Sequence, residues 1–190
     1  MNKSIQFLFA SLLSCQVFGD VSIGSYPTSW PELQLHISGK DCSKILGKYD
    51  YDGIFFQAPD TYGPINIHNV FNLSDHQFNA NSVASFSLTA RKSAFYIDID
   101  VTQDKAGLSN SSFPLGSNCK NGWLFYTKII SGAGDGTPSR SVATYNISVA
   151  RDGALVIENE TVRKEKVLFL LESSSSRRSW YKFDKVIADE

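Results

Sequence analysis

Two stretches of alternating apolar and polar residues give the clearest structural signal in this chain: Ser141-Val-Ala-Thr-Tyr-Asn-Ile-Ser-Val-Ala150 and Ala154-Leu-Val-Ile-Glu-Asn-Glu-Thr-Val162. They are separated by the turn Arg-Asp-Gly at 151–153. Both stretches are rich in β-branched residues, and an Asp-Gly pair between such segments is typical of a β-hairpin. The sequence therefore predicts a hairpin over 141–162.

The loop length of this hairpin sets its register. A two-residue loop would place Ile147 opposite Glu158 and would mix apolar and polar side chains on both faces. A three-residue loop, with Gly153 in the left-handed conformation of a G1 bulge, instead pairs Val149 with Leu155. That register places Ile147, Ile157 and Tyr145 on one apolar face. We expect this face in the core and the opposite face in water, with Thr144, Asn146, Ser148, Glu158 and Glu160.

The rest of the chain repeats this period-two pattern in short segments with turn residues between them. We expect strands at 33–37, 65–73, 82–90, 94–102, 123–130, 166–171 and 180–187, and one helical turn at 42–46. Loops are expected at 105–122 and 131–139, and an exposed hairpin tip at 173–178. About ten short strands without a long helical pattern predict an all-β fold. We interpret it as a single antiparallel β-sandwich, jelly-roll-like, over residues 20–190.

Composition excludes some classes of protein. The chain has 190 residues, 13% of them aromatic and 19% charged, and a formal net charge of −1. These values argue against a disordered chain and against a nucleic-acid-binding protein held by phosphate contacts. No mature segment approaches the roughly 18 apolar residues that a transmembrane helix requires, so no transmembrane segment is predicted.

The first 19 residues have the pattern of a secretory signal peptide. Lys3 precedes an apolar run at 5–13, and the small Gly19 provides a cleavage point before Asp20. This pattern predicts a secreted, extracellular protein. The alternative is a bacterial lipoprotein box at 12–15, in which Cys15 would carry a lipid anchor.

An extracellular location sets expectations for cysteine and asparagine residues. Cys42 and Cys119 are the two cysteines that remain after cleavage, and in an oxidising compartment we expect them to form a disulfide. Four Asn-X-Ser/Thr sequons are candidate glycosylation sites: Asn72, Asn110, Asn146 and Asn159. Asn146 falls on the predicted polar face of the hairpin, whereas Asn159 falls on the apolar side by parity.

The acidic residues of one predicted strand are the candidates for metal binding or catalysis. Asp98 and Asp100 are two residues apart, so their carboxylates share one face of a strand about 7 Å apart. With Asp104 they could hold Ca²⁺, or they could act as acid and base in glycoside hydrolysis. The alternative is a solvated strand face. No other cofactor is predicted.

Aromatic and acidic residues in predicted loops are the candidate ligand-binding residues: Trp30, Tyr49, Tyr51, Asp52 and Asp135. Exposed rings beside Asp and Asn are typical of a sugar platform, because the ring stacks on the apolar sugar face. The leading hypothesis is a glycosylated, non-catalytic binding module for a glycan or an extracellular protein surface. The alternatives are a polysaccharide-active hydrolase or lyase using Asp98 and Asp100, and a cell-surface or host-interaction protein acting through Arg177 and Arg178.

Overall fold

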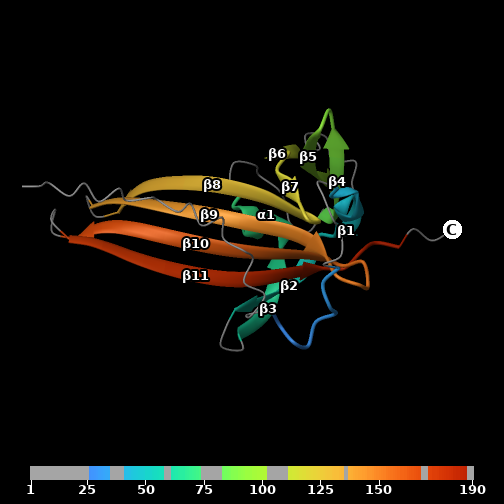
Figure 1. Ribbon diagram of the computed structural model, residues 1–190, viewed down its shortest axis with the longest axis horizontal. Helices are drawn as coiled ribbons and strands as arrows, with labels where there is room; N and C mark the ends of the chain where they lie inside the picture. Colours follow the sequence, from blue (N-terminus) through green and yellow to red (C-terminus); the bar gives the residue numbers. More distant parts are fainter. Residues whose placement is uncertain are drawn as a thin grey trace, which may run out of the picture.

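Figure 1 shows a computed structural model in which two antiparallel β-sheets account for almost all regular structure. The structure describes residues 26–34, 41–57, 61–73, 83–101, 111–134, 137–167 and 171–187. The predicted signal peptide at 1–19, and with it Cys15, lies outside these residues. So do Asp104, Asn110 and Asp135. The predicted all-β sandwich is confirmed, with eleven strands among the described residues.

The smaller sheet has four strands in the order β1-β4-β5-β6. Its members are β1 (Gly47–Asp50), β4 (Val83–Arg91), β5 (Ala94–Val101) and β6 (Ser111–Gly116). A short 3-10 helix, η2 (Ser43–Ile45), precedes β1 where a helical turn was predicted. β6 lies inside the predicted loop at 105–122, so that part of the prediction is wrong.

The larger sheet has seven strands in the order β3-β2-β11-β10-β9-β8-β7. Its members are β2 (Asp52–Gln57), β3 (Thr61–Asn66), β7 (Cys119–Lys120), β8 (Trp123–Gly134), β9 (Thr137–Val149), β10 (Leu155–Val167) and β11 (Leu171–Phe183). β7 to β11 follow one another as a meander, and β2 and β3 extend the sheet beyond β11.

The central hairpin has the predicted register. Val149 pairs with Leu155, and Ile147 pairs with Ile157. Gly153 has φ 87°, and its amide donates to the carbonyl of Ala150 at 3.0 Å. The three-residue loop and its left-handed glycine are therefore confirmed.

The main core lies between the two sheets. Phe86 of the smaller sheet packs edge-on against Phe183 of the larger one, with ring centroids 5.4 Å apart. Tyr145, Ile147 and Ile157 face the same space and are buried. The apolar face of the hairpin is thus the floor of the sandwich core, as predicted.

The opposite face of the hairpin is covered as well, which the sequence analysis did not predict. A second group of buried residues, here called the outer cluster, lies on it: Leu33, Phe56, Trp123, Ala150, Val156 and Trp180. Glu158 and Ser148 belong to this face and are each only 1% exposed. The expectation of a fully wet face is therefore wrong, because the segment before β1 and strand β2 bring apolar side chains onto it.

One predicted strand is a helix instead. Residues 65–73 contain the end of β3 and then α1 (Ile67–Phe71). The side chain of Asn66 caps this helix by accepting a hydrogen bond from the amide of Asn69 at 2.9 Å. Asn72 ends the helix in the left-handed conformation, with φ 47°. Ile67, Val70 and Phe71 of α1 are buried in the main core.

The last four strands extend beyond the sandwich as a long four-stranded projection (Figure 1). We call its distal part the arm, comprising residues 129–134, 137–142, 162–167 and 171–176. The predicted loop at 131–139 and the predicted tip at 173–178 are largely strand here, so both predictions are wrong. The predicted strand at 166–171 is divided between two strands, since β10 ends at Val167 and β11 begins at its partner Leu171, and residues 168–170 lie outside the described residues.

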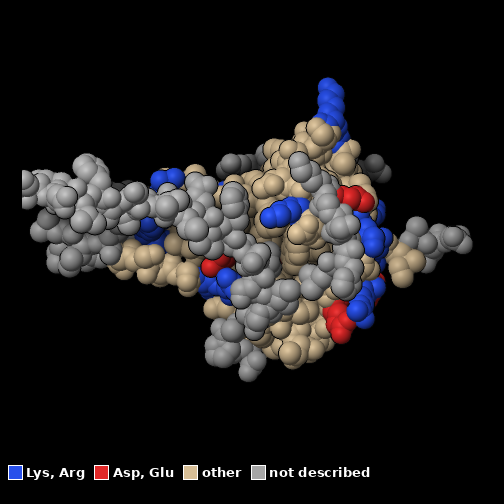
Figure 2. Space-filling model, viewed as in Figure 1, with Lys and Arg blue, Asp and Glu red and all other residues tan. Residues whose placement is uncertain are grey.

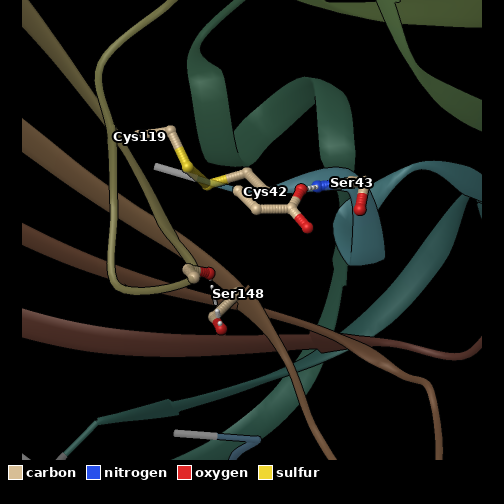
Figure 3. The surroundings of a disulfide bond; sticks show 6 residues. Cys42, Ser43, Cys119 and Ser148 are labelled. Carbon is tan, nitrogen blue, oxygen red and sulfur yellow. Dashed lines mark hydrogen bonds between the residues drawn. A yellow bond between two sulfur atoms is a disulfide. The ribbon is translucent and has the colours of Figure 1, made fainter. Parts of the chain in front are cut away.

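The predicted disulfide is present and links the two sheets (Figure 3). Cys42 lies next to η2, which leads into the smaller sheet, and Cys119 lies in β7 at the edge of the larger sheet. The two Cα atoms are 6.0 Å apart, and both side chains are buried.

Candidate functional site

Two of the predicted ligand-binding aromatics are core residues. Tyr49 is 0% exposed, and its hydroxyl donates to the carbonyl of Ile45 at 2.9 Å. Burial raises the pKa of Tyr49 to about 12. Tyr51 is also buried. Neither ring is accessible for stacking on a sugar, so Tyr49 and Tyr51 cannot belong to the predicted sugar platform. Asp52, by contrast, is exposed at the start of β2.

Trp30 lies in the turn before Pro31 and is half-buried, so its ring is partly exposed. Its ring packs edge-on against Tyr26, with centroids 5.9 Å apart, and Tyr26 in turn packs against Trp180 at 5.1 Å. The hydroxyl of Tyr26 donates to the carbonyl of Pro31 at 2.7 Å. Trp30 therefore covers the outer cluster and retains part of its surface in contact with solvent.

Asp98 lies on the face of the smaller sheet that points away from the core, since its neighbours Ile97 and Ile99 point inward. Its carboxylate accepts hydrogen bonds from Arg91 at 2.5 Å and from Thr89 at 2.6 Å. Burial alone would raise its pKa, but hydrogen bonds from Ser112 and Thr89 and the charge of Arg91 lower it. Asp98 is thus held as an ionised partner of Arg91.

The predicted metal site of Asp98, Asp100 and Asp104 stays a prediction, because most of it falls outside the described residues. Asp104 lies outside them, as does the side chain of Asp100. Within the described part of the chain, no three His, Cys, Asp or Glu side chains come together as metal ligands. Asp98 does not line the cavity that opens between β6 and β8.

Three of the four sequons lie in the described part of the chain. Asn72 is exposed at the end of α1. Asn146 is half-buried in β9, and its amide donates to the buried Glu158 at 2.8 Å. Asn159 is half-buried in β10, and its amide donates to the carbonyl of Thr144 at 3.4 Å. Of these three described asparagines, Asn72 alone is exposed.

A cavity of about 210 Å³ opens between the sheets where β6 approaches β8. None of the residues that form it was predicted as a site residue: Phe71, Asn72, Leu73, Ile97, Phe113, Pro114, Leu115, Tyr126 and Lys128. Phe71, Leu73, Ile97 and Leu115 are buried and form its apolar floor. Phe113, Tyr126 and Lys128 are half-buried, while Asn72 and Pro114 are exposed at the rim.

Lys128 is the charged residue of this cavity. Its ammonium donates to the carbonyls of Phe71 and Asn72, at 3.1 and 3.0 Å. These carbonyls belong to the C-terminal end of α1, where backbone acceptors lack helical partners. Tyr126 supplies a half-buried phenol whose pKa is raised by burial. The cavity thus combines ring and aliphatic walls with one cation.

The arm is the second feature that the structure offers to a partner. Cross-strand pairing aligns Ile129, Val142 and Val162 in one apolar row, which ends at Ser176 in β11. Ile129 is 56% exposed, and both valines are half-buried. The next row on the same face contains Ser131, Arg140, Lys164 and Ser174. Every arm residue whose burial is described is exposed or half-buried.

Charge is dispersed over the coloured part of the face shown in Figure 2. On the face shown in Figure 2, Lys and Arg side chains lie in separate groups, and the coloured residues form no continuous basic stripe. The longest helix in the described ranges is α1, so none has the length and apolarity to cross a bilayer.

The architecture so far defines a disulfide-linked two-sheet β-protein with a projecting arm. Comparison with models of known protein families, with curated proteins and with solved structures finds no match.

Proposed function

We propose that this protein is a secreted, non-catalytic binding module whose partner is an extracellular protein, contacted through the arm. The observation that carries the proposal is the apolar row of Ile129, Val142 and Val162 on the arm, where every residue whose burial is described is exposed or half-buried. Secretion rests on the leader at 1–19, and the disulfide between Cys42 and Cys119 is compatible with it.

A sheet normally buries at least one face against another layer, because strand pairing alone is marginally stable in water. The sandwich meets this requirement through its two clusters of buried residues. The arm continues the same strands without such a layer among the described residues, so its apolar row is available to a partner.

The composition of the arm favours a protein partner. The apolar row is bordered by Ser131, Arg140 and Lys164. An apolar centre with a polar, partly charged rim is typical of protein interfaces. Arg177 and Arg178, predicted as part of a hairpin tip, instead lie in β11 beside the base of the arm, where Arg178 pairs with Glu158 at 3.3 Å.

A glycan remains the second candidate, because one aromatic surface favours it. Tyr62 is 49% exposed, and its ring lies 4.8 Å from that of Phe56 in the outer cluster. The half-buried Trp30 packs against the same cluster. These rings could stack on a sugar.

Site-specific photo-crosslinking tests the proposal. A benzophenone amino acid at position 129 is expected to crosslink one extracellular protein of the source organism, whereas the same probe at the exposed position 92 gives none. Once that partner is purified, Ile129→Ser combined with Val162→Ser should weaken binding at least tenfold. Ile54→Ser is the matched control, since Ile54 is 44% exposed on β2, outside the arm. Undiminished binding by the double variant would refute the arm as the interface, and glycan-array binding would favour the second candidate.

A further inference from the structure

We propose that the cavity between β6 and β8 binds a small organic carboxylate with an aryl or short acyl body. The inference is independent of the arm, because the cavity lies at the sandwich and is lined by other residues. Three properties of the cavity carry it: its walls, its size and its single cation.

The walls suit an apolar body. The rings of Phe71, Phe113 and Tyr126 line the cavity together with the side chains of Leu73 and Leu115. The ring of Phe71 stacks on Tyr145 beneath it at 4.7 Å and lies 6.1 Å from Tyr126. Packed aromatic neighbours hold Phe71 and Tyr126 in place, so a ligand meets a largely preformed surface.

The size sets the kind of molecule. An apolar cavity of about 150 Å³ can hold a benzene ring. The cavity of about 210 Å³ therefore has room for a ring or short chain with a small head group, about ten to twelve non-hydrogen atoms. This favours a small molecule over a folded partner or a long lipid.

Lys128 selects the head group. Two of the three hydrogens of its ammonium point to the carbonyls of Phe71 and Asn72. Among the described residues, no carboxylate lies within salt-bridge distance of this ammonium. A cation beside an apolar wall, whose partners among the described residues are neutral carbonyls, favours an anion that can accept its third hydrogen.

The alternative role of Lys128 is to cap the C-terminal end of α1 and nothing more. Helix capping and ligand binding require different properties of the Lys128 side chain. Capping needs only a donor near two carbonyls, whereas ligand selection needs the charge to face the cavity. An experiment that compares a charged with a neutral ligand of the same shape separates the two roles.

The probes are 3-phenylpropanoate and the neutral alcohol 3-phenylpropan-1-ol, titrated into the ¹⁵N-labelled, disulfide-bonded mature chain. Amide shift changes are expected at 71–73, 97, 113, 115 and 126–128, with the carboxylate bound at least tenfold more tightly than the alcohol. Lys128→Met should reduce this preference below twofold while leaving alcohol binding in place. Lys128→Arg should keep it. Lys164→Met, an exposed lysine of the arm, is the matched control and should change neither affinity.

A further variant guards against misfolding at α1. Phe113→Trp adds bulk to a half-buried wall of the cavity and leaves the residue at position 128 unchanged. It should weaken the binding of both probes at least tenfold. Equal affinity for the two probes in the parent protein would overturn the proposal. So would a preference that survives Lys128→Met, or shift changes that map away from the cavity.

Discussion

Removing the disulfide provides a quantitative test of how the two sheets are held together. The variant Cys42→Ala with Cys119→Ala deletes a bond that spans 77 residues of sequence. In the chain-entropy treatment, closing a loop of that length lowers the entropy of the unfolded chain enough to stabilise the fold by about 4.5 kcal/mol. Measured values are commonly about 2 to 4 kcal/mol. We therefore expect a loss of about 3 to 4 kcal/mol in the free energy of unfolding.

The assay is urea unfolding of the mature chain, followed by circular dichroism at a β-sheet wavelength. The parent in a reducing agent should show the same loss as the double variant, since both lack the bond. The denaturant slope should also increase, because an unfolded chain without the cross-link exposes more surface. A loss below about 1 kcal/mol, in a parent shown by mass spectrometry to contain the bond, would refute the reasoning.

Two further substitutions and one measurement of glycosylation have expected outcomes. Gly53→Ala should destabilise the fold by about 2 to 3 kcal/mol, because the added Cβ would lie 2.3 Å from the carbonyl oxygen of Lys182. Gly132→Ala is its control, where the nearest atom is a side-chain oxygen at 3.6 Å, and equal thermal stability of the two variants would contradict the packing argument. Glu158→Gln should flatten the pH dependence of stability. Desolvation raises the pKa of Glu158 in the fold, so the contribution of Glu158 to the free energy of unfolding falls as the pH rises from about 4.3, the unfolded value, through the folded pKa. Urea unfolding from pH 4 to 8 measures this dependence. Parallel curves for parent and variant would contradict it. In a secretory eukaryotic host, peptide mass spectrometry should find glycan on Asn72 and not on Asn146, whose amide is bonded to the buried Glu158; folded protein fully occupied at Asn146 would show this expectation to be wrong.

Local sequence was sufficient where a strand and its partner are adjacent in the chain. The register of Val149 with Leu155 follows from parity and one glycine, both of which are visible in 22 consecutive residues. The pairing of Cys42 with Cys119 was predictable for a different reason, since these two are the only cysteines of the sequence outside the predicted signal peptide.

Sequence was misleading where distant segments decide the environment. Tyr49 follows a lysine and precedes an aspartate, which reads as a surface turn, yet the neighbouring β4 brings Phe86 to 5.6 Å from its ring. Glu158 looked solvent-exposed by parity, but Trp123 and Trp180 lie on its face of the sheet. Such burial depends on strand order, which no local pattern encodes.

The distal part of the arm was missed because several of its residues have low intrinsic preference for strands. Ser173 to Ser176 and Gly132 read as loop, and yet each has a partner in the neighbouring strand. The strands continue there because the hairpin register set nearer the core carries the pairing outward. The cavity was missed because its walls come from α1, β5, β6 and β8, which are distant in sequence. The capping asparagine Asn66 was a readable signal for α1.

The outer cluster also determines what an optical experiment on this protein would report. All three tryptophans of the chain are in it or against it: Trp123 and Trp180 are members, and Trp30 packs on its surface. Indole emission therefore follows solvent entry on one side of the larger sheet. The interior between the sheets contains tyrosine and phenylalanine but no indole, so its loosening would leave the emission spectrum unchanged. Aromatic ellipticity near 275 nm, where tyrosine absorbs, is the complementary readout for that interior.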